Sequence, residues 1–291
     1  MEVVTSPREM RTTAEELRRK KSSLGLVPTM GYFHEGHLSL MRRARADCQR
    51  VVVSLFVNPT QFGPSEDLGR YPRDFERDRE LAATEGVDIV FAPAAKDIYP
   101  EGYATYVDVE RLSEGLCGAS RPGHLRGVAT VVAKLFNICR PTAAYFGQKD
   151  YQQAQVIKRL AADLNFDVEI EVLPIVREAD GLAVSSRNQY LEPEERRQAT
   201  CLFRALARAQ ELFAAGETQP AKFVDEMTAV VAAQPAVRVD YAEVIHPQEL
   251  TLVATVEEGA VAAVAAFVNE TRLIDNTILG KEDLRAEVST C

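Results

Sequence analysis

Residues 24–57 read LGLVPTMGYFHEGHLSLMRRARADCQRVVVSLFV, and this stretch decides the fold. It opens with a short apolar run that ends at Pro28, as a buried strand does. From about His37 onward, apolar residues recur at the spacing of an amphipathic helix. The run over 51–57, which is apolar except for Ser54, suits a parallel strand that is buried on both faces. Strand, loop, helix and strand within roughly 30 residues predict a β-α-β unit.

The same alternation continues along the first 176 residues. A charged helix over 73–86 precedes an apolar strand over 87–93, and a helix over 124–140 carries a clear apolar stripe. Repeated β-α-β units predict an α/β fold with a mainly parallel sheet. The remaining expected elements are helices over 12–21 and 149–165 and strands over 143–147 and 166–174.

The pattern changes after about residue 176. Helices and strands that occur in separate runs are typical of an α+β domain. We therefore expect two domains, a larger α/β domain over 1–176 and a smaller α+β domain over 177–291, joined through the loop READGLAVSSRNQYLEP. In the second domain we expect a long helix over 194–216, a helix over 220–234, and strands over 237–245 and 260–268.

The composition limits the classes of function. The chain of 291 residues carries 34 Lys and Arg against 43 Asp and Glu, a net charge of −9. So acidic a protein repels the phosphates of nucleic acid, although a local basic pocket for a small anion is compatible with it. The N-terminal MEVVTSPREMRTT lacks the apolar core of a signal peptide. The longest apolar run, GAVAAVAAFV, is shorter than the roughly 20 residues of a membrane span.

The cysteines, at 48, 117, 139, 201 and 291, form no CxxC pair, and their number is odd. This pattern indicates neither a disulfide framework nor a zinc site. We therefore expect a protein of the reducing cytoplasm, with no nucleic acid and no membrane among its partners.

Polar loops follow four of the expected strands. In an open parallel sheet, ligands bind beyond the carboxyl ends of the strands, so these loops are expected to meet at one edge. The polar residues in them are His34 and His37; Asn58 and Gln61; Lys149, Asp150, Gln152 and Gln153; and Ser185, Ser186, Arg187 and Asn188.

This edge suits a nucleotide. A helix N-terminus offers free N–H groups to a phosphate, and His37 lies at one. Imidazole can donate a hydrogen bond to a phosphate oxygen, and Lys149 and Arg187 add cations. Gln61 and Gln153 suit a substrate with hydroxyl groups, because an amide both donates and accepts.

Other interpretations of these residues stay open at this point. His34 and His37 are three residues apart and could chelate a metal, but zinc usually needs a third protein ligand and none is evident nearby. The two histidines could also be structural, and Gln61, Gln153 and Lys149 could be ordinary surface residues. We interpret His124 as a cap of the helix that follows it, and His246 and the cysteines as structural or incidental.

Five segments in order carry a resemblance to a known family. They read PTMGYFHEGHLSL, FVNPTQF, YPRDFERD, FGQKDYQQ and READGLAVSSRNQYL. His-x-Gly-His after the first strand of a Rossmann-like sheet resembles the nucleotidylyl-transferase superfamily, and the five segments together resemble the pantothenate synthetases. The resemblance covers about residues 3 to 280. It implies an enzyme that joins (R)-pantoate to β-alanine with ATP and Mg²⁺, releases AMP and pyrophosphate through a pantoyl adenylate, and forms a homodimer.

The resemblance also implies roles for individual residues. His34, His37, Lys149 and Arg187 would be catalytic, and Gln61, Gln153, Asn58 and Asp78 would bind pantoate or line its cavity. The ATP site would comprise Met30, Gly31, Tyr32, Phe33, His34, Glu35, Gly36, His37, Gly147, Gln148, Lys149, Asp150, Val176, Val184, Ser185, Ser186 and Arg187. No protein ligand of Mg²⁺ is implied.

Two positions depart from the family pattern, and two classes of rival function remain. Val184 stands where Met or Leu is common, and Gln148 where Glu is common. The nearest rival is another transferase of the superfamily, for example a cytidylyl transferase. A non-catalytic nucleotide sensor would bind ATP without turnover. A dehydrogenase is disfavoured because no GxGxxG loop follows the first strand.

Overall fold

The structure, a computed structural model, describes residues 1–64, 66–281 and 284 of the chain. It divides into two compact units. The first comprises Met1–Gly147 and Gln152–Pro174, and the second comprises Gln148–Tyr151 and the chain from Ile175 onward. The expected division into domains after residue 176 stays a prediction. No helix in the described ranges has the length and apolar character that a membrane crossing requires.

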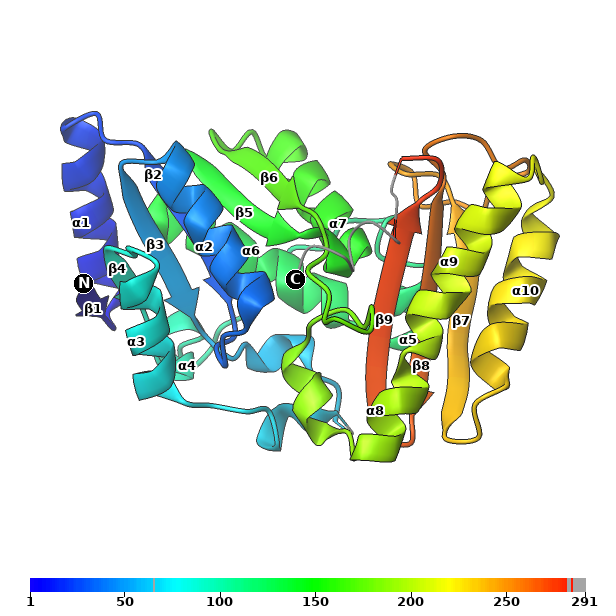
Figure 1. Cartoon of the computed structure of the whole chain (residues 1–291). Coiled ribbons are helices and arrows are strands. Elements are labelled where there is room, and N and C mark those ends of the chain that lie inside the picture. Colours follow the sequence, from blue (N-terminus) through cyan, green and yellow to red (C-terminus); the bar gives the residue numbers. More distant parts are fainter. Residues whose placement is uncertain (65, 282–283, 285–291) are drawn as a thin grey trace. The chain divides into compact units, whose positions relative to one another are not determined.

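The first unit is built on a parallel sheet of six strands in the order β1-β4-β3-β2-β5-β6 (Figure 1). The predicted parallel α/β sheet is therefore confirmed. Its strands are β1 (Glu2–Val4), β2 (Leu24–Thr29), β3 (Arg50–Leu55), β4 (Ile89–Phe91), β5 (Ala143–Gly147) and β6 (Glu169–Leu173). The sequence pattern did not predict β1, which has three residues and pairs with β4.

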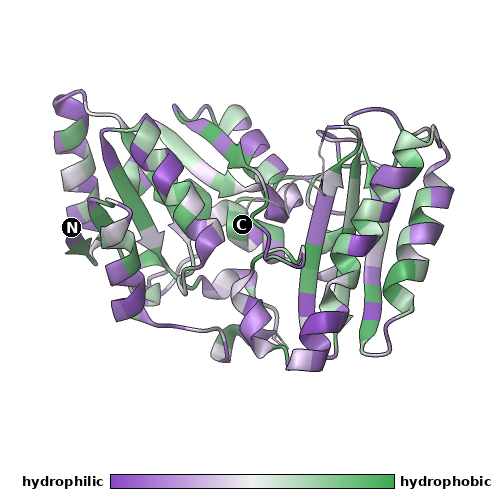
Figure 2. Ribbon diagram, in the orientation of Figure 1, coloured by the Kyte–Doolittle hydropathy of each residue, from purple (hydrophilic) through white to green (hydrophobic). Residues whose placement is uncertain are grey.

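Helices cover both faces of this sheet, as a parallel sheet requires. Successive residues of β3 show how: Val52 packs into one core, whereas Val51 and Val53 pack into the other. The first core is closed by α1 (Pro7–Arg19), α6 (His124–Cys139) and α7 (Tyr151–Asp163), and the second by α2 (Glu35–Asp47) and α3 (Phe75–Thr84). The strands β3 and β5 are accordingly hydrophobic along most of their length (Figure 2). Shorter elements of this unit are η1 (Pro59–Gln61), η2 (Asp67–Gly69), α4 (Ala95–Ile98) and α5 (Cys117–Ser120).

The strand order reverses between β2 and β5. From β2 the chain proceeds outward through β3 and β4, and it then returns to β5 on the other side of β2. The two strands are hydrogen-bonded neighbours, with Gly25 opposite Ala143. Ligands of open α/β sheets bind beyond the carboxyl ends of the strands at such a reversal. The segment that follows β2 is MGYFHEGH, residues 30–37.

The second unit is an antiparallel sheet of three strands with helices, which confirms the predicted α+β character. Its strands are β7 (Val237–Ile245), β8 (Val261–Val268) and β9 (Thr271–Ile278), and its other elements are η3 (Gln148–Asp150), η4 (Ser186–Tyr190), α8 (Pro193–Ala199), α9 (Cys201–Ala214) and α10 (Pro220–Ala232). The strand β9 was not predicted. It carries both hydrophilic and hydrophobic residues, without strict alternation (Figure 2).

The prediction of a single helix over 194–216 was wrong. The structure has α8 and α9 with Thr200 between them. The Thr200 hydroxyl donates to the Arg197 carbonyl at 2.7 Å, and such a local bond between side chain and backbone competes with a regular helix. Other helix starts also shift: α1 begins at Pro7 rather than at Thr12, α2 begins at Glu35 rather than near His37, and the helix expected from residue 149 begins at Tyr151, after η3.

Candidate active site

The loop after β2 turns sharply before α2 begins. Gly31 has φ +86° and Tyr32 has φ +54°, the left-handed region that glycine adopts readily and other residues seldom adopt. A Cβ at Gly31 would lie 3.0 Å from a carboxylate oxygen of Asp78. Glycine therefore meets two requirements at this position, the positive φ and the close approach of Asp78.

Asp78 of α3 holds this loop in place. Its two carboxylate oxygens accept the backbone N–H groups of Tyr32 and Phe33, both at 2.6 Å. Arg77 adds a hydrogen bond from its guanidinium to the Phe33 carbonyl at 2.9 Å. The Asp78 side chain is buried, and burial raises the pKa of its carboxyl while the two N–H donors act in the opposite direction. Asp78 therefore shapes the loop.

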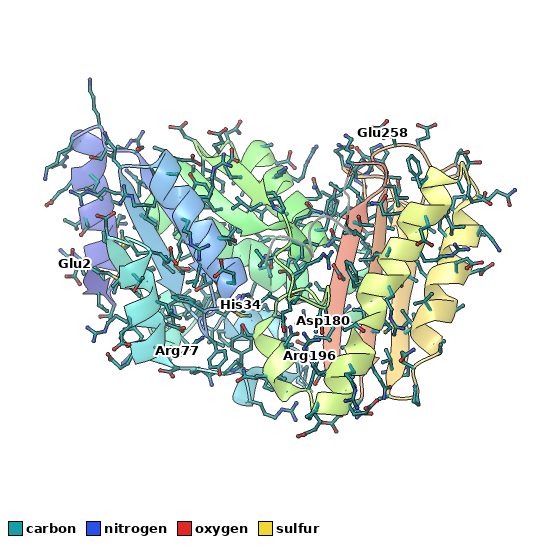
Figure 3. All side chains as sticks on the ribbon, viewed as in Figure 1. Glu2, His34, Arg77, Asp180, Arg196 and Glu258 are labelled. Carbon is teal, nitrogen blue, oxygen red and sulfur yellow. The ribbon has the colours of Figure 1, made fainter. Side chains whose placement is uncertain are left out.

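His34 and His37 lie against each other at the start of α2. His34 is the N-cap residue, and its backbone N–H donates to Nδ1 of His37 at 3.3 Å. The ring centroids are 4.0 Å apart. Because Nδ1 of His37 accepts this bond, the neutral ring carries its proton on Nε2. Figure 3 shows His34 and, on α3, Arg77.

Two other side chains of the predicted ATP segment make contacts within the protein. The Phe33 ring is fully buried in the core beneath α2. Glu35 forms an ion pair with Arg42 at 2.6 Å, and Arg42 also contacts Glu85 at 2.9 Å. The ion pairs of Arg42 with Glu35 and Glu85 fix α2 against the end of α3. Because the side chains of Phe33 and Glu35 make contacts within the protein, a ligand at this loop would contact the backbone of these two residues.

Asn58 and Gln61 form a second polar group, at η1. The Asn58 amide donates to the Gln61 side-chain oxygen at 3.0 Å, and the Gln61 amide nitrogen lies 3.1 Å from the Met30 sulfur. Tyr99 donates to the Asn58 side-chain oxygen at 2.8 Å. The structure therefore joins η1 to the first residue of the loop after β2.

The neighbouring glutamines of α7 differ in their surroundings. Gln152 is buried, and its amide accepts from the Cys117 backbone N–H at 3.0 Å and donates to the carbonyls of Leu112 and Gly115, both at 2.8 Å. Gln153 is half-buried, and its side chain has no hydrogen-bond partner in the described ranges. Gln152 holds the loop before α6, whereas the Gln153 amide is available to a ligand.

In the second unit, Asn276 of β9 holds η3. Its amide donates to the carbonyls of Gln148 and Lys149, both at 3.0 Å. The Lys149 ammonium lies 3.9 Å from the carboxylate of Asp150. The sequence pattern did not single out Asn276. Arg272, Asp275 and Asn276 interrupt the apolar residues of this segment, so no regular alternation marked Asn276 as inward-facing.

A buried ion pair fixes the loop 177–193 to β9. Arg177 and Asp275 are both buried and lie 2.7 Å apart, and Arg177 also donates to the Gly181 carbonyl at 3.1 Å. Gly181 has φ +89°, and a Cβ there would lie 2.4 Å from the Phe203 ring. The loop is therefore held at its base by charge and by close packing.

The SSRN turn continues this loop as η4. The Ser185 hydroxyl accepts the Arg187 backbone N–H at 3.3 Å, and Ser186 is buried. Asn188 donates to Glu178 at 2.9 Å, and Glu178 in turn pairs with Arg196 at 2.6 Å. Arg196 also pairs with Asp180, and both are labelled in Figure 3. Val176 and Val184 are half-buried.

The remaining histidines and cysteines differ in part from expectation. His124 does not cap α6: the N-cap residue is Gly123, and the His124 ring instead contacts the Gln61 carbonyl. His246 accepts two backbone N–H groups in a turn, which is a structural role. Four cysteines, at 48, 117, 139 and 201, are buried, and Cys291 lies outside the described residues. The described ranges contain no cluster of three or more metal-binding side chains.

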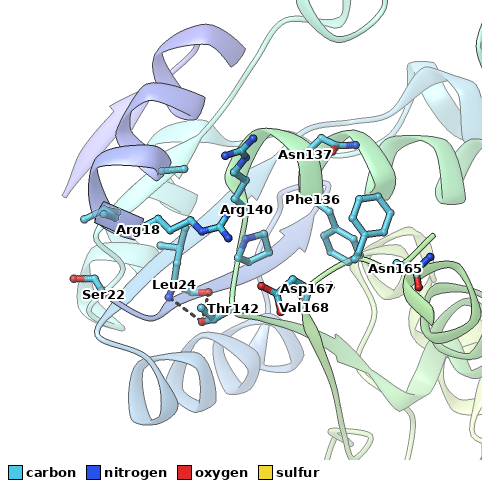
Figure 4. A pocket seen from close by; sticks show the side chains of 14 residues that line it. Arg18, Ser22, Leu24, Phe136, Asn137, Arg140, Thr142, Asn165, Asp167 and Val168 are labelled. Atoms are coloured by element: carbon cyan, nitrogen blue, oxygen red, sulfur yellow. Dashed lines mark hydrogen bonds between the residues drawn. The ribbon is translucent and has the colours of Figure 1, made fainter. Parts of the chain in front are cut away.

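A cavity of about 230 Å³ lies at the opposite end of the sheet (Figure 4). It is lined by residues of the ends of α1 and α6 and of the starts of β2 and β5, among them Arg18, Arg140 and Thr142. The Thr142 hydroxyl exchanges hydrogen bonds with the Leu24 backbone there. Because this cavity faces away from the carboxyl ends of the strands, it is no part of the candidate site.

The fold and the loop after β2 define a class: α/β proteins with a His-x-Gly-His motif at a helix N-terminus, beside the reversal of strand order. The sequence profile of the Pantoate-beta-alanine ligase family matches residues 2–278. The chain belongs to this family and is a pantoate–β-alanine ligase, which forms pantothenate.

Two pantothenate synthetases match the sequence over nearly the whole chain. The pantothenate synthetase of Pelotomaculum thermopropionicum is 56% identical, over 94% of this chain and 97% of the relative. That of Thermotoga neapolitana is 54% identical, over 96% of this chain and all of the relative.

Two solved structures are similar as well. The crystal structure of the pantothenate synthetase from Thermus thermophilus has a TM-score of 0.90 at 48% identity, over 96% of this chain and 99% of that one. The pantoate-beta-alanine ligase from Francisella tularensis, complexed with beta-gamma ATP and beta-alanine, has a TM-score of 0.80 at 31% identity, over 96% and 97% of the two chains. The expected fold and activity are therefore confirmed.

Proposed function

We propose that the ligase works in two steps through a pantoyl adenylate. A carboxylate oxygen of pantoate attacks the α-phosphorus of ATP, and the bond to pyrophosphate breaks. The amine of β-alanine then attacks the acyl carbon, the bond to AMP breaks, and the amine loses a proton. Adenylation is needed because an unactivated carboxylate forms no amide at neutral pH. A complex of the Francisella tularensis relative with beta-gamma ATP and beta-alanine supports ATP as the activating substrate.

The single observation that carries the proposal is the arrangement of His34 and His37. Both rings lie at the N-terminus of α2, next to the reversal of strand order. Charge builds on phosphoryl oxygens as pyrophosphate leaves, and preorganised donors at a helix N-terminus stabilise it. We assign the Nε2–H of His37 to this task, together with the backbone of the loop that Asp78 holds.

The other predicted site residues are assigned by the same proposal. Gln61 and Gln153 bind pantoate, Asn58 fixes the Gln61 amide, and Asp78 positions the loop. In the second unit Lys149 and Arg187 supply cations to the phosphates, and Ser185 and Ser186 bind them. The remaining members of the ATP site stay as the resemblance implies: Met30, Gly31, Tyr32, Phe33, Glu35, Gly36, Gly147, Gln148, Asp150, Val176 and Val184.

Mg²⁺ fits this site as a companion of ATP. The ion prefers octahedral oxygen ligands and usually binds through substrate phosphates, water and at most one or two carboxylates. We therefore expect that such an ion would be held mainly by the phosphate oxygens of ATP. When bound, it neutralises charge on the departing pyrophosphate.

The assembly and the motion of the second unit are further parts of the proposal. An acyl adenylate hydrolyses in water, so a unit that closes over the nucleotide would protect it. We propose that the second unit acts as this lid, that the enzyme is a homodimer, and that it works in the cytoplasm. Light scattering of the purified protein measures the oligomer, and a monomer would contradict that part.

Isotope transfer tests the adenylate directly. Pantoate labelled with ¹⁸O in its carboxylate should give AMP that carries one ¹⁸O atom, because the bridging oxygen of the adenylate leaves with AMP. Mass spectrometry of the nucleotide product measures this. Unlabelled AMP, or ADP as the product, would contradict the proposed route.

A further inference from the structure

The backbone of Gln61 is held by residues that no part of the proposed function uses. Nδ1 of His124 lies 2.8 Å from the Gln61 carbonyl oxygen, and Nη2 of Arg121 donates to the same oxygen at 3.3 Å. Nη1 of Arg121 lies 3.1 Å from Nε2 of His124. Glu66 completes the group with two hydrogen bonds from Arg121, at 2.8 and 2.6 Å.

The two contacts of His124 fix its tautomer. A carbonyl oxygen can only accept a hydrogen bond, so Nδ1 must carry the proton. A guanidinium can only donate, so Nε2 must be the acceptor. Both partners therefore select the same neutral ring. Protonation of Nε2 would place an N–H against the N–H of Arg121 and would break the second contact.

The helix α6 packs closely on η1, so the position of the His124 ring affects the backbone of Gln61. Gly127 lies one turn after His124, and a Cβ there would come within 2.3 Å of the Thr60 carbonyl oxygen. The Gly127 carbonyl accepts the Asn58 amide at 3.1 Å. The first turn of α6 thus holds both the main chain of Gln61 and the residue that holds its side chain.

We propose that His124 is a positioning residue for pantoate, and that only its neutral form holds Gln61 in the productive geometry. The inference rests on the proposed role of Gln61. Within the described ranges, the other titratable and charged groups around the ring include Arg121, Glu66 and the Cys117 thiol, which lies 3.9 Å from Nη1 of Arg121. Imidazole titrates between about pH 5 and 8, so pantoate binding weakens as the pH falls through this range.

Two substitutions of His124 test the inference by steady-state kinetics. His124→Ala should raise the pantoate KM about tenfold, the factor that corresponds to ~1.4 kcal/mol and to the loss of one hydrogen bond. The ATP KM should change less than twofold. His124→Asn keeps an N–H donor near the position of Nδ1 and should restore most of the pantoate affinity. His246→Ala, a substitution of an exposed histidine in the second unit, is the matched control and should change neither constant.

The pH profile separates positioning from simple packing. Between pH 8 and pH 5.5 the pantoate KM of the wild-type enzyme should rise more than that of His124→Asn, whose side chain does not titrate. The ATP KM should change with pH in the same way in the wild-type enzyme and in His124→Asn. Parallel pantoate profiles, or an unchanged pantoate KM in His124→Ala, would overturn the inference. Thermal unfolding of each variant shows whether it is folded.

Gln61→Ala shows which claim has failed. If Gln61→Ala raises the pantoate KM and the His124 variants do not, the positioning role alone is wrong. If Gln61→Ala leaves the pantoate KM unchanged, the role of Gln61 and the inference built on it are both wrong.

Discussion

The backbone N–H of His34 donates to Nδ1 of His37 across the first turn of α2. This bond orients the second imidazole and places the proton of its neutral form on Nε2. The proposed function therefore gives His37 two separable functions, closing the helix N-terminus through Nδ1 and contacting phosphate through Nε2.

Two amide substitutions separate these functions. Asn at position 37 can accept near Nδ1, and Gln can donate near Nε2. We expect His37→Asn to lower the adenylation rate about 10²-fold, as the loss of one preorganised donor does, and His37→Gln to lower it less. Single-turnover release of pyrophosphate, without β-alanine, measures both. If Asn were the better replacement, His37 would act through the loop and not on the phosphates.

Gln152 and Gln153 form a matched pair of the same residue type. Gln152→Ala leaves three backbone groups without partners and should lower the free energy of unfolding by about 3 kcal/mol. Gln153→Ala should leave stability unchanged and raise the pantoate KM far more than the ATP KM. Urea unfolding and steady-state kinetics measure the two effects. Equal changes in both KM values for Gln153→Ala would contradict its role with pantoate.

Asp78→Asn tests how Asp78 holds the loop after β2, which the proposed function assigns to ATP. The amide has one acceptor oxygen, so one of the two N–H groups of Tyr32 and Phe33 loses its partner. We expect the free energy of unfolding to fall by about 2 kcal/mol and the ATP KM to rise. Asp97→Asn, an exposed position in α4, is the control for the loss of one negative charge. A normal ATP KM in a destabilised Asp78→Asn would show that the loop shape does not matter for ATP.

Asp275→Asn tests the buried ion pair of the second unit. Removing one partner leaves the Arg177 charge buried without its counter-ion, and such losses are typically about 3–5 kcal/mol. We expect a fall of about 3 kcal/mol in the free energy of unfolding, measured in urea. Asp240→Asn breaks the more exposed pair with Arg272 and should have a smaller effect. Equal effects of the two substitutions would contradict the importance of burial.

The sequence predicted those elements whose pattern is local. The strand over 143–147 has the expected bounds, because a short apolar run between turns indicates a buried strand from the local sequence alone. β9 was missed because Arg272, Asp275 and Asn276 interrupt its apolar residues, and the partner of Asp275 lies 98 residues away in the chain. Local pattern cannot show a pairing of that kind.

The same limit applies to the candidate site. The histidines and the polar loops were identifiable because they follow strands. The difference between Gln152 and Gln153 depends on which side of α7 faces the loop before α6, and the hold of Asp78 on Tyr32 spans 46 residues. Tertiary contacts decide both.

Arg187→Ala tests the contribution of the second unit. A cation on the departing pyrophosphate should be worth about 3 kcal/mol, or roughly 10²-fold in rate. Arg187→Lys should recover only part of this, since an ammonium lacks the planar fork of a guanidinium. Single-turnover adenylation measures the effect, and a normal rate in folded Arg187→Ala would leave the residue a structural role only.

Isotope exchange between pyrophosphate and ATP tests the two-step account most directly. The enzyme is incubated with ATP, Mg²⁺, pantoate and labelled pyrophosphate, without β-alanine. Because adenylation precedes amide formation, label should enter ATP at a rate that depends on pantoate, and omission of pantoate should abolish it. Exchange that occurs only when β-alanine is present would contradict a pantoyl adenylate that forms before β-alanine reacts, and it would support a concerted reaction.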